Sequence, residues 1–108
     1  MPSTKFFDIV SDLVYLHMKM KGKSYRDISI ILNLNESYVR QIHSRSVRKR
    51  YSLVHLSILS YEWGIPIGKF IPSESTIQLL TEFSNHSERE RKEFIKKLYE
   101  ELRGENYG

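Results

Sequence analysis

The feature that most constrains this chain is a pair of short segments with helical periodicity on either side of Asn33. Ser24 is a suitable N-cap for the first segment, and Asp27 stands where a capping box needs its acidic partner. Asn33 tolerates the left-handed backbone that ends a helix, and Asn35 is a suitable N-cap for the next one. The sequence therefore predicts a short helix after Ser24, a tight turn, and a second helix that ends near Ser44.

Apolar side chains recur at three- and four-residue spacing along the rest of the chain, and no strand-like alternation competes with them. We expect one helix to end at Gly22 and another to run from Ser52 to Gly64. Two more are expected, over residues 74–83 and after Ser87. Ile67 and Phe70 are expected to close the core in a short helix or turn. The expected inward positions are Phe6, Phe7, Val10, Leu13, Val14, Leu16, Ile28, Ile31, Leu32, Val39, Ile42, Leu53, Leu56, Leu59, Trp63, Ile77, Leu80, Phe83, Phe94, Ile95, Leu98 and Leu102.

The charge of the chain is divided unevenly. Residues 1–71 contain 11 Lys and Arg against 5 Asp and Glu, whereas residues 72–108 contain 6 against 8. No acidic residue lies between Ser37 and Tyr61. A basic stretch beside an acidic tail is typical of a polyanion-binding module joined to a second element. The sequence thus predicts an all-α protein, with a binding domain in 1–71 and a helical extension in 72–108.

Several classes of protein are excluded or disfavoured. The chain has no cysteine, which excludes disulfides, thiolate zinc sites and cysteine nucleophiles. No signal peptide or membrane span is expected, so we predict a cytoplasmic protein. No catalytic or phosphate-binding motif occurs, and we expect neither an enzyme nor a cofactor nor a bound metal. The four histidines are scattered along the sequence as His17, His43, His55 and His86. We expect His17 to lie in the core.

Two stretches in this order resemble the lambda repressor/Cro (Xre) family of helix-turn-helix proteins. The first is GKSYRDISIILNLNESYVRQI, residues 22–42, and the second is SLVHLSILSYEWGIPIGKF, residues 52–70. The resemblance implies a five-helix helix-turn-helix domain. The chain departs from the family pattern at Tyr25, where Gln is common, and at Asn33, where the turn glycine is usual. Arg45 replaces the glycine that is common after the third helix.

The resemblance also implies a set of DNA contacts, in which the second helix of the motif enters the major groove. By position, the base-reading residues would be Glu36, Ser37, Arg40 and Gln41. Gln41 suits adenine and Arg40 suits guanine. Glu36 would either accept a hydrogen bond from cytosine or favour the helix dipole, and we expect the second. Phosphate contacts, which set the register, are expected from Tyr25, Tyr38, Arg45, Arg48, Lys49 and Arg50.

The C-terminal extension carries an apolar stripe that a five-helix domain does not need. Repressors of this family usually bind two-fold related half-sites, so the resemblance implies a homodimer. We expect the stripe to form the dimer interface, through Ile77, Leu80, Phe94, Ile95, Leu98 and Leu102. Packing of the same stripe against the first helix of its own chain is the alternative.

The function implied by the resemblance is that of a sequence-specific regulator of transcription that binds double-stranded DNA, in most such proteins a repressor. Proteins of this kind are frequent in phages, mobile elements and bacterial chromosomes. We expect control to come through another protein or through the concentration of the regulator. The alternative is a protein-interaction module on the same scaffold, such as an antirepressor or antitoxin-like partner. In that case the C-terminal stripe binds a foreign protein and the basic loop is dispensable.

Overall fold

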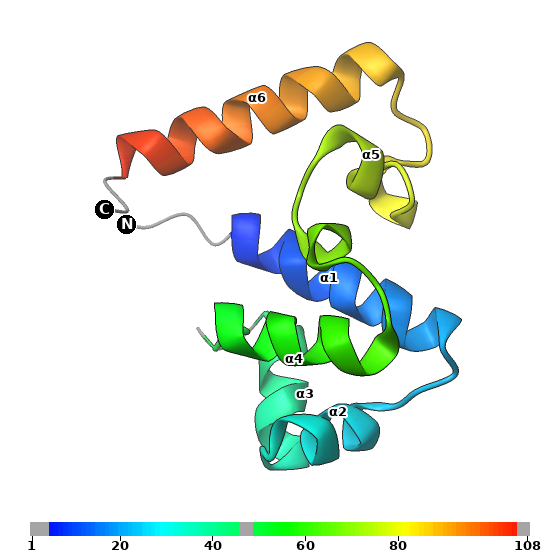
Figure 1. Cartoon of the computed structure of the whole chain (residues 1–108). Coiled ribbons are helices and arrows are strands. Elements are labelled where there is room, and N and C mark those ends of the chain that lie inside the picture. Colours follow the sequence, from blue (N-terminus) through cyan, green and yellow to red (C-terminus); the bar gives the residue numbers. More distant parts are fainter. Residues whose placement is uncertain (1–4, 46–48, 106–108) are drawn as a thin grey trace.

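The computed structural model describes residues 5–45 and 49–105, and every regular element in these ranges is helical (Figure 1). Helices make up 73% of the described residues, so the predicted all-α fold is confirmed. No helix in these ranges is both long and apolar enough to span a bilayer. The elements are α1 (Lys5–Met20), α2 (Tyr25–Leu32), α3 (Glu36–Ser44), α4 (Leu53–Trp63), the 3-10 helix η1 (Ile67–Phe70), α5 (Glu74–Ile77), the 3-10 helix η2 (Thr81–Phe83) and α6 (Glu88–Gly104).

The helices begin where capping residues stand in the sequence. The Ser24 hydroxyl accepts a hydrogen bond from the N–H of Asp27, and the Asp27 carboxylate accepts one of 2.8 Å from the N–H of Ser24. Ser87 and Glu90 repeat this capping box at the start of α6. These backbone N–H donors lower the pKa of both carboxyl groups. Asn35 holds the N-cap position of α3, but its side chain makes no capping hydrogen bond.

A first core lies between α1 and the four elements α2, α3, α4 and η1. α1 supplies Val10 and Val14 to it, and Phe70 of η1 closes it as the sequence predicts. His17 is buried in contact with the Phe70 ring, as expected of a core histidine. In Figure 1, α1 crosses the middle of the molecule, with α2, α3 and α4 on one side and α5 and α6 on the other.

A second core lies on the opposite side of α1. Ile9 and Leu13 of α1 are buried there against α5, η2 and α6. The hydroxyl of Tyr99 in α6 donates a hydrogen bond of 2.7 Å to the carbonyl oxygen of Pro72. Residues 72–105 are therefore built onto α1, and in this described part of the chain their core is shared with that helix.

This packing corrects the predicted dimer interface. Ile77, Leu80 and Leu98 are between 0% and 8% exposed within the single chain, and Phe94 and Ile95 pack beside them. Leu102 is half-buried. The alternative, packing against the first helix, is what the structure has, because α1 carries apolar residues on two opposite faces. Five of these six side chains therefore pack inside the chain, and Leu102 is not part of that core.

Two further expectations need correction. Residues 74–83 do not form one helix: α5 ends at Ile77, and the backbone turns before η2. Apolar residues at three-residue spacing suit 3-10 turns as well as an α-helix, so turns bury Ile77, Leu80 and Phe83 equally well. Leu53 is 71% exposed, although Leu56, Leu59 and Trp63 of α4 are buried as expected.

Candidate nucleic-acid interface

The turn between α2 and α3 holds these helices in a compact helix-turn-helix. Asn33 adopts the left-handed conformation, with φ 55° and ψ 47°, that the family's glycine would adopt more easily. The N–H of Leu34 donates to the carbonyl oxygen of Ser29 at 2.9 Å and closes the end of α2. Ser29 is buried, and its hydroxyl donates to the carbonyl oxygen of Arg26 at 2.6 Å. A small, internally satisfied residue thus allows α3 to approach α2 closely.

One face of α3 points into the core and the opposite face is open. Val39 and Ile42 are 0% and 4% exposed, and they anchor the helix. The other face carries the four residues to which the resemblance assigns base reading. Ser37 and Arg40 are exposed, whereas Glu36 and Gln41 are half-buried. The structure therefore brings these four side chains together on one surface, where their role stays a prediction.

Arg40 is held in place on this open face. Its Nε and Nη2 atoms donate to one carboxylate oxygen of Glu36 at 3.0 and 2.6 Å. Its guanidinium carbon also lies 5.4 Å from the centre of the Tyr25 ring, at the start of α2. Glu36 thus positions Arg40 as well as standing in the first turn of α3.

The inner edge of α3 is fixed by a buried pair that the sequence did not reveal. The Nε2 atom of His43 and the hydroxyl of Tyr51 share a hydrogen bond of 2.6 Å, and Tyr51 is 4% exposed. The rings of Tyr25 and His43 are 4.9 Å apart. Burial lowers the pKa of His43 to about 4 and raises that of Tyr51, so both groups are neutral near pH 7. No local pattern pairs positions eight residues apart across a loop, which is why this contact could not be predicted.

Of the residues assigned to phosphate contacts, some lie at or beside α3 and another contacts α1. Tyr38 belongs to α3, and the ammonium of Lys49 lies 4.6 Å from the centre of its ring, so Lys49 lies beside α3. Tyr25 flanks it on the side of Arg40. Arg50 lies further off, with its guanidinium carbon 4.0 Å from the centre of the Phe7 ring. Arg48 lies outside the described residues.

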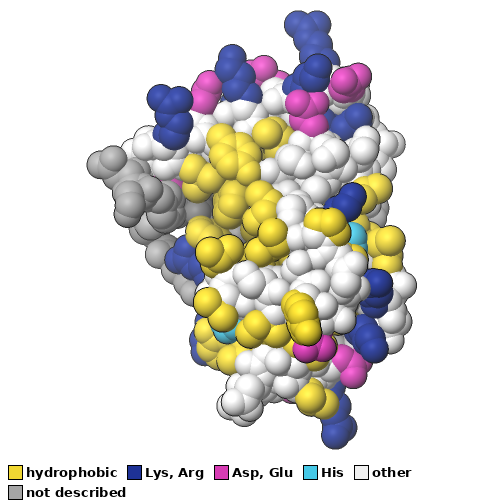
Figure 2. Space-filling view, in the orientation of Figure 1, with side chains coloured by type: hydrophobic (Ala, Val, Ile, Leu, Met, Phe, Trp, Pro, Cys, Tyr) yellow, Lys and Arg dark blue, Asp and Glu magenta, His cyan; other side chains and the backbone are white. Residues whose placement is uncertain are grey.

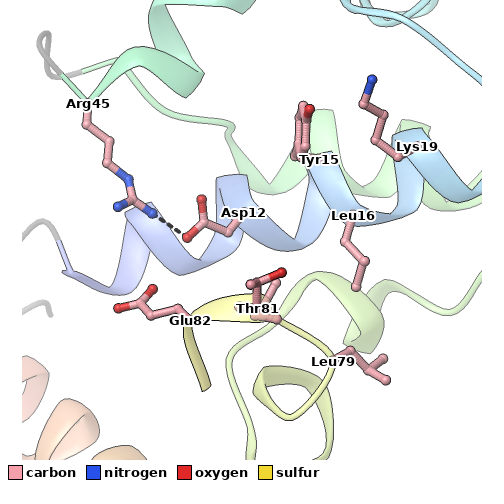
Figure 3. A pocket seen from close by; sticks show the side chains of 9 residues that line it. Asp12, Tyr15, Leu16, Lys19, Arg45, Leu79, Thr81 and Glu82 are labelled. Carbon is pink, nitrogen blue, oxygen red and sulfur yellow. Dashed lines mark hydrogen bonds and ion pairs between the residues drawn. The ribbon is translucent and has the colours of Figure 1, made fainter. Parts of the chain in front are cut away.

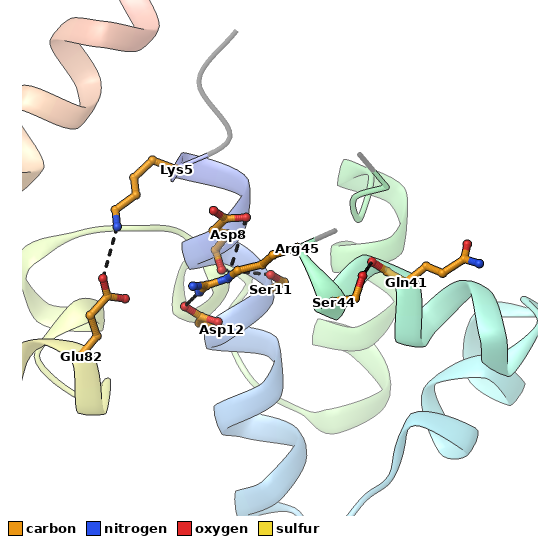
Figure 4. A network of polar contacts seen from close by, with 8 residues as sticks. All are labelled: Lys5, Asp8, Ser11, Asp12, Gln41, Ser44, Arg45 and Glu82. Atoms are coloured by element: carbon orange, nitrogen blue, oxygen red, sulfur yellow. Dashed lines mark hydrogen bonds and ion pairs between the residues drawn. The ribbon is translucent and has the colours of Figure 1, made fainter. Parts of the chain in front are cut away.

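Arg45 has a structural place that the sequence did not predict. Its guanidinium forms an ion pair and a hydrogen bond with Asp12 of α1, and its Nε atom lies 4.0 Å from a carboxylate oxygen of Asp8 (Figure 4). Arg45 itself is left-handed, with φ 62°, at the end of α3. Its charge is compensated inside the protein, so we withdraw it from the phosphate contacts. In Figure 4 the side chain of Gln41 points away from this network.

A groove of about 380 Å³ lies beside this ion pair, between α1 and the segment around Leu79 (Figure 3). Its charged side chains already have partners. Asp12 pairs with Arg45, Glu82 pairs with Lys5 at 3.2 Å, and the ammonium of Lys19 lies over the Tyr15 ring. Burial raises the pKa of Asp12, against the opposing effect of Arg45. The groove therefore offers little uncompensated charge to a ligand, and we assign no ligand to it.

The geometry defines an all-helical protein with an open, polar helix face on a helix-turn-helix. No protein-family model matches the chain, and no curated protein or solved structure matches it either. The functional inference therefore depends on the residues of this site and on the resemblance described above.

Proposed function

We propose that the protein is a sequence-specific regulator that binds double-stranded DNA and represses transcription by occupying its site. The observation that carries this proposal is the open face of α3, which presents hydrogen-bonding side chains while Val39 and Ile42 anchor its other face. The major groove of B-DNA is about 12 Å wide and admits one α-helix. A helix that is anchored on one side and polar on the other suits that groove.

Base reading is assigned to Gln41 and Arg40, because an amide pairs with adenine and a guanidinium with guanine in the major groove. Arg40 is the better ordered of the two, since Glu36 and the Tyr25 ring hold its guanidinium. Pre-ordering reduces the entropy that binding costs. The carboxylate of Glu36 is repelled by phosphates, so we assign it to positioning Arg40 and not to contacting DNA.

Backbone contacts are assigned to Lys49, Tyr38, Tyr25 and Arg50, with Arg48 added from the sequence alone. No acidic residue between Ser37 and Tyr61 opposes them. With Arg45 withdrawn, three cationic contacts remain, from Lys49, Arg50 and Arg48. The binding constant is therefore expected to fall roughly as the third power of the salt concentration.

The first test is selection of bound duplexes from a randomised DNA library at moderate salt, followed by sequencing. An enriched inverted repeat is expected, and the distance between its halves gives the half-site spacing. Salt-sensitive binding without any enriched sequence would contradict a sequence-specific regulator. The alternative of a protein-interaction module relied on the C-terminal stripe, which is buried within the chain.

Substitutions on α3 make this test specific. Gln41→Ala and Arg40→Ala are each expected to cost about 1–3 kcal/mol of discrimination at one base position, with the fold intact by circular dichroism. Selection results identical to those of the unsubstituted protein would refute base reading by α3.

Removal of a backbone contact should act differently. Lys49→Ala is expected to weaken binding to all sequences equally and to reduce the salt exponent by about 1. Lys96→Ala, an exposed substitution on α6, is the matched control because it removes the same charge far from α3 in sequence. Equal effects of the two variants would mean that binding follows net charge alone.

A further inference from the structure

The outer face of α4 is apolar and uncovered. A helix that is apolar on all sides is normally buried on all sides, yet only Leu56, Leu59 and Trp63 of α4 are fully covered. Leu53 is 71%, Val54 65% and Tyr61 84% exposed. In Figure 2, hydrophobic side chains lie on the surface over the region where Figure 1 places α4.

These exposed side chains form one continuous surface. On a helix of 3.6 residues per turn, Leu53, Ser57 and Tyr61 follow one another at successive turns, and Val54 and Ile58 lie beside them. We call these five residues the α4 face. It contains no Lys, Arg, Asp or Glu. The hydroxyl of Ser57 donates to the carbonyl oxygen of Leu53 at 2.9 Å, so burial of this serine would leave no donor unsatisfied.

We propose that the α4 face binds the α4 face of a second copy of this chain in an antiparallel two-fold contact. The chain carries a net charge of +4, and an uncharged face is where two copies meet without placing like charges together. The small Ser57, at the centre of the face, lets two helices cross closely.

The antiparallel direction follows from the ends of α4. The N-terminal end of α4 carries the partial positive charge of the helix dipole, and the exposed Glu62 stands near its C-terminal end. An antiparallel pair brings Glu62 of one copy toward the positive N-terminal end of α4 in the other and also opposes the two helix dipoles. A parallel pair would place like ends together.

The choice of a second copy rests in part on the proposed function, because two-fold related half-sites require two copies of α3. The C-terminal stripe is not available as the interface in the same way, since five of its six residues pack inside the chain. A helix of 11 residues is about 16 Å long and supplies fewer contacts than a standard interface of 20–30 residues a side. We therefore expect a weak dimer that dissociates at roughly micromolar or higher concentrations.

Sedimentation equilibrium of the full chain without DNA tests the proposal. The apparent mass is expected to rise from one chain to two with concentration, and Leu53→Lys or Tyr61→Lys to raise the dissociation constant at least about tenfold. Met20→Lys is the matched control, because Met20 is 68% exposed on α1, and it should leave the dissociation constant unchanged. A chain that stays monomeric, or a dimer unaffected by both α4 substitutions, would overturn the proposal.

A second measurement does not depend on the lysine variants. The chain has no cysteine, so Ser57→Cys introduces its sole thiol, at the proposed crossing point. Air oxidation is expected to link Ser57→Cys into disulfide dimers at least about tenfold faster than Ser84→Cys, an exposed control after η2. Equal rates would overturn the proposal.

The two proposals can fail separately. Dimers that depend on the α4 face but select no DNA sequence would refute the regulator and leave the interface standing. Enrichment of a single half-site by a monomeric protein would refute the interface and leave the DNA-binding regulator standing.

Discussion

Burial of neutral His43 makes the fold sensitive to acid. Its ring is enclosed by α3, the start of α2 and Tyr51, and burial lowers its pKa from 6.5 to about 4. Above pH 6.5 the histidine is neutral in the folded and the unfolded chain, and the full stability is present. Below pH 6.5 the unfolded chain binds a proton that the folded chain does not bind until about pH 4. Stability is therefore lost as the pH falls through this window.

The magnitude follows from the width of the window. At about 1.4 kcal/mol per pH unit, His43 is expected to account for a loss of about 3 kcal/mol in the free energy of unfolding between pH 6.5 and pH 4. A small domain has only about 5–15 kcal/mol of total stability, so the loss is large. Burial also lowers the pKa of His17, which adds to the loss in the same direction.

The assay is urea unfolding at a series of pH values for the unsubstituted protein and for His43→Gln, both at one protein concentration. Glutamine can hydrogen-bond to Tyr51 but does not titrate. The variant should lose less stability than the unsubstituted protein between pH 6.5 and 4, by about 3 kcal/mol. Parallel curves for the two proteins would refute the reasoning, because the neutral His43 would then contribute nothing to the pH dependence.

The other predictions concern the second core and the end of α3. Leu98→Ala is expected to lower the free energy of unfolding by about 2–5 kcal/mol and to leave the dissociation constant of any dimer unchanged. A weaker dimer with unaltered urea unfolding would instead make Leu98 an interface residue. Arg45→Gly is expected to be more stable than Arg45→Ala by about 1 kcal/mol, because glycine tolerates φ 62° and both variants lose the pair with Asp12. Identical urea midpoints for these two variants would show that the left-handed backbone stores no strain.

The sequence alone determined much of the local structure of this protein, although not the turns that replace a single helix over residues 74–83. Caps such as Ser24 and Ser87 predict where helices begin, because their side chains bond to backbone N–H groups only a few residues away. Asn33 predicts the tight turn because it tolerates the left-handed backbone, which is also a local property. The composition of α3, with apolar Val39 and Ile42 opposite a polar face, also predicts which of its side chains are open to solvent.

The tertiary structure decided which side chains from distant parts of the sequence contact each other. Periodicity shows that α1 is apolar but not that Ile9 and Leu13 serve a second core, because the partner of an apolar stripe lies far away in the sequence. The same is true of charge: Arg45 looks like a phosphate contact until the fold brings Asp12 within reach of it. Leu53 and Leu56 are the same residue type in the same helix, yet only Leu56 is buried by the rest of the chain. Such long-range contacts depend on how the helices pack together, and local propensity carries no information about that packing.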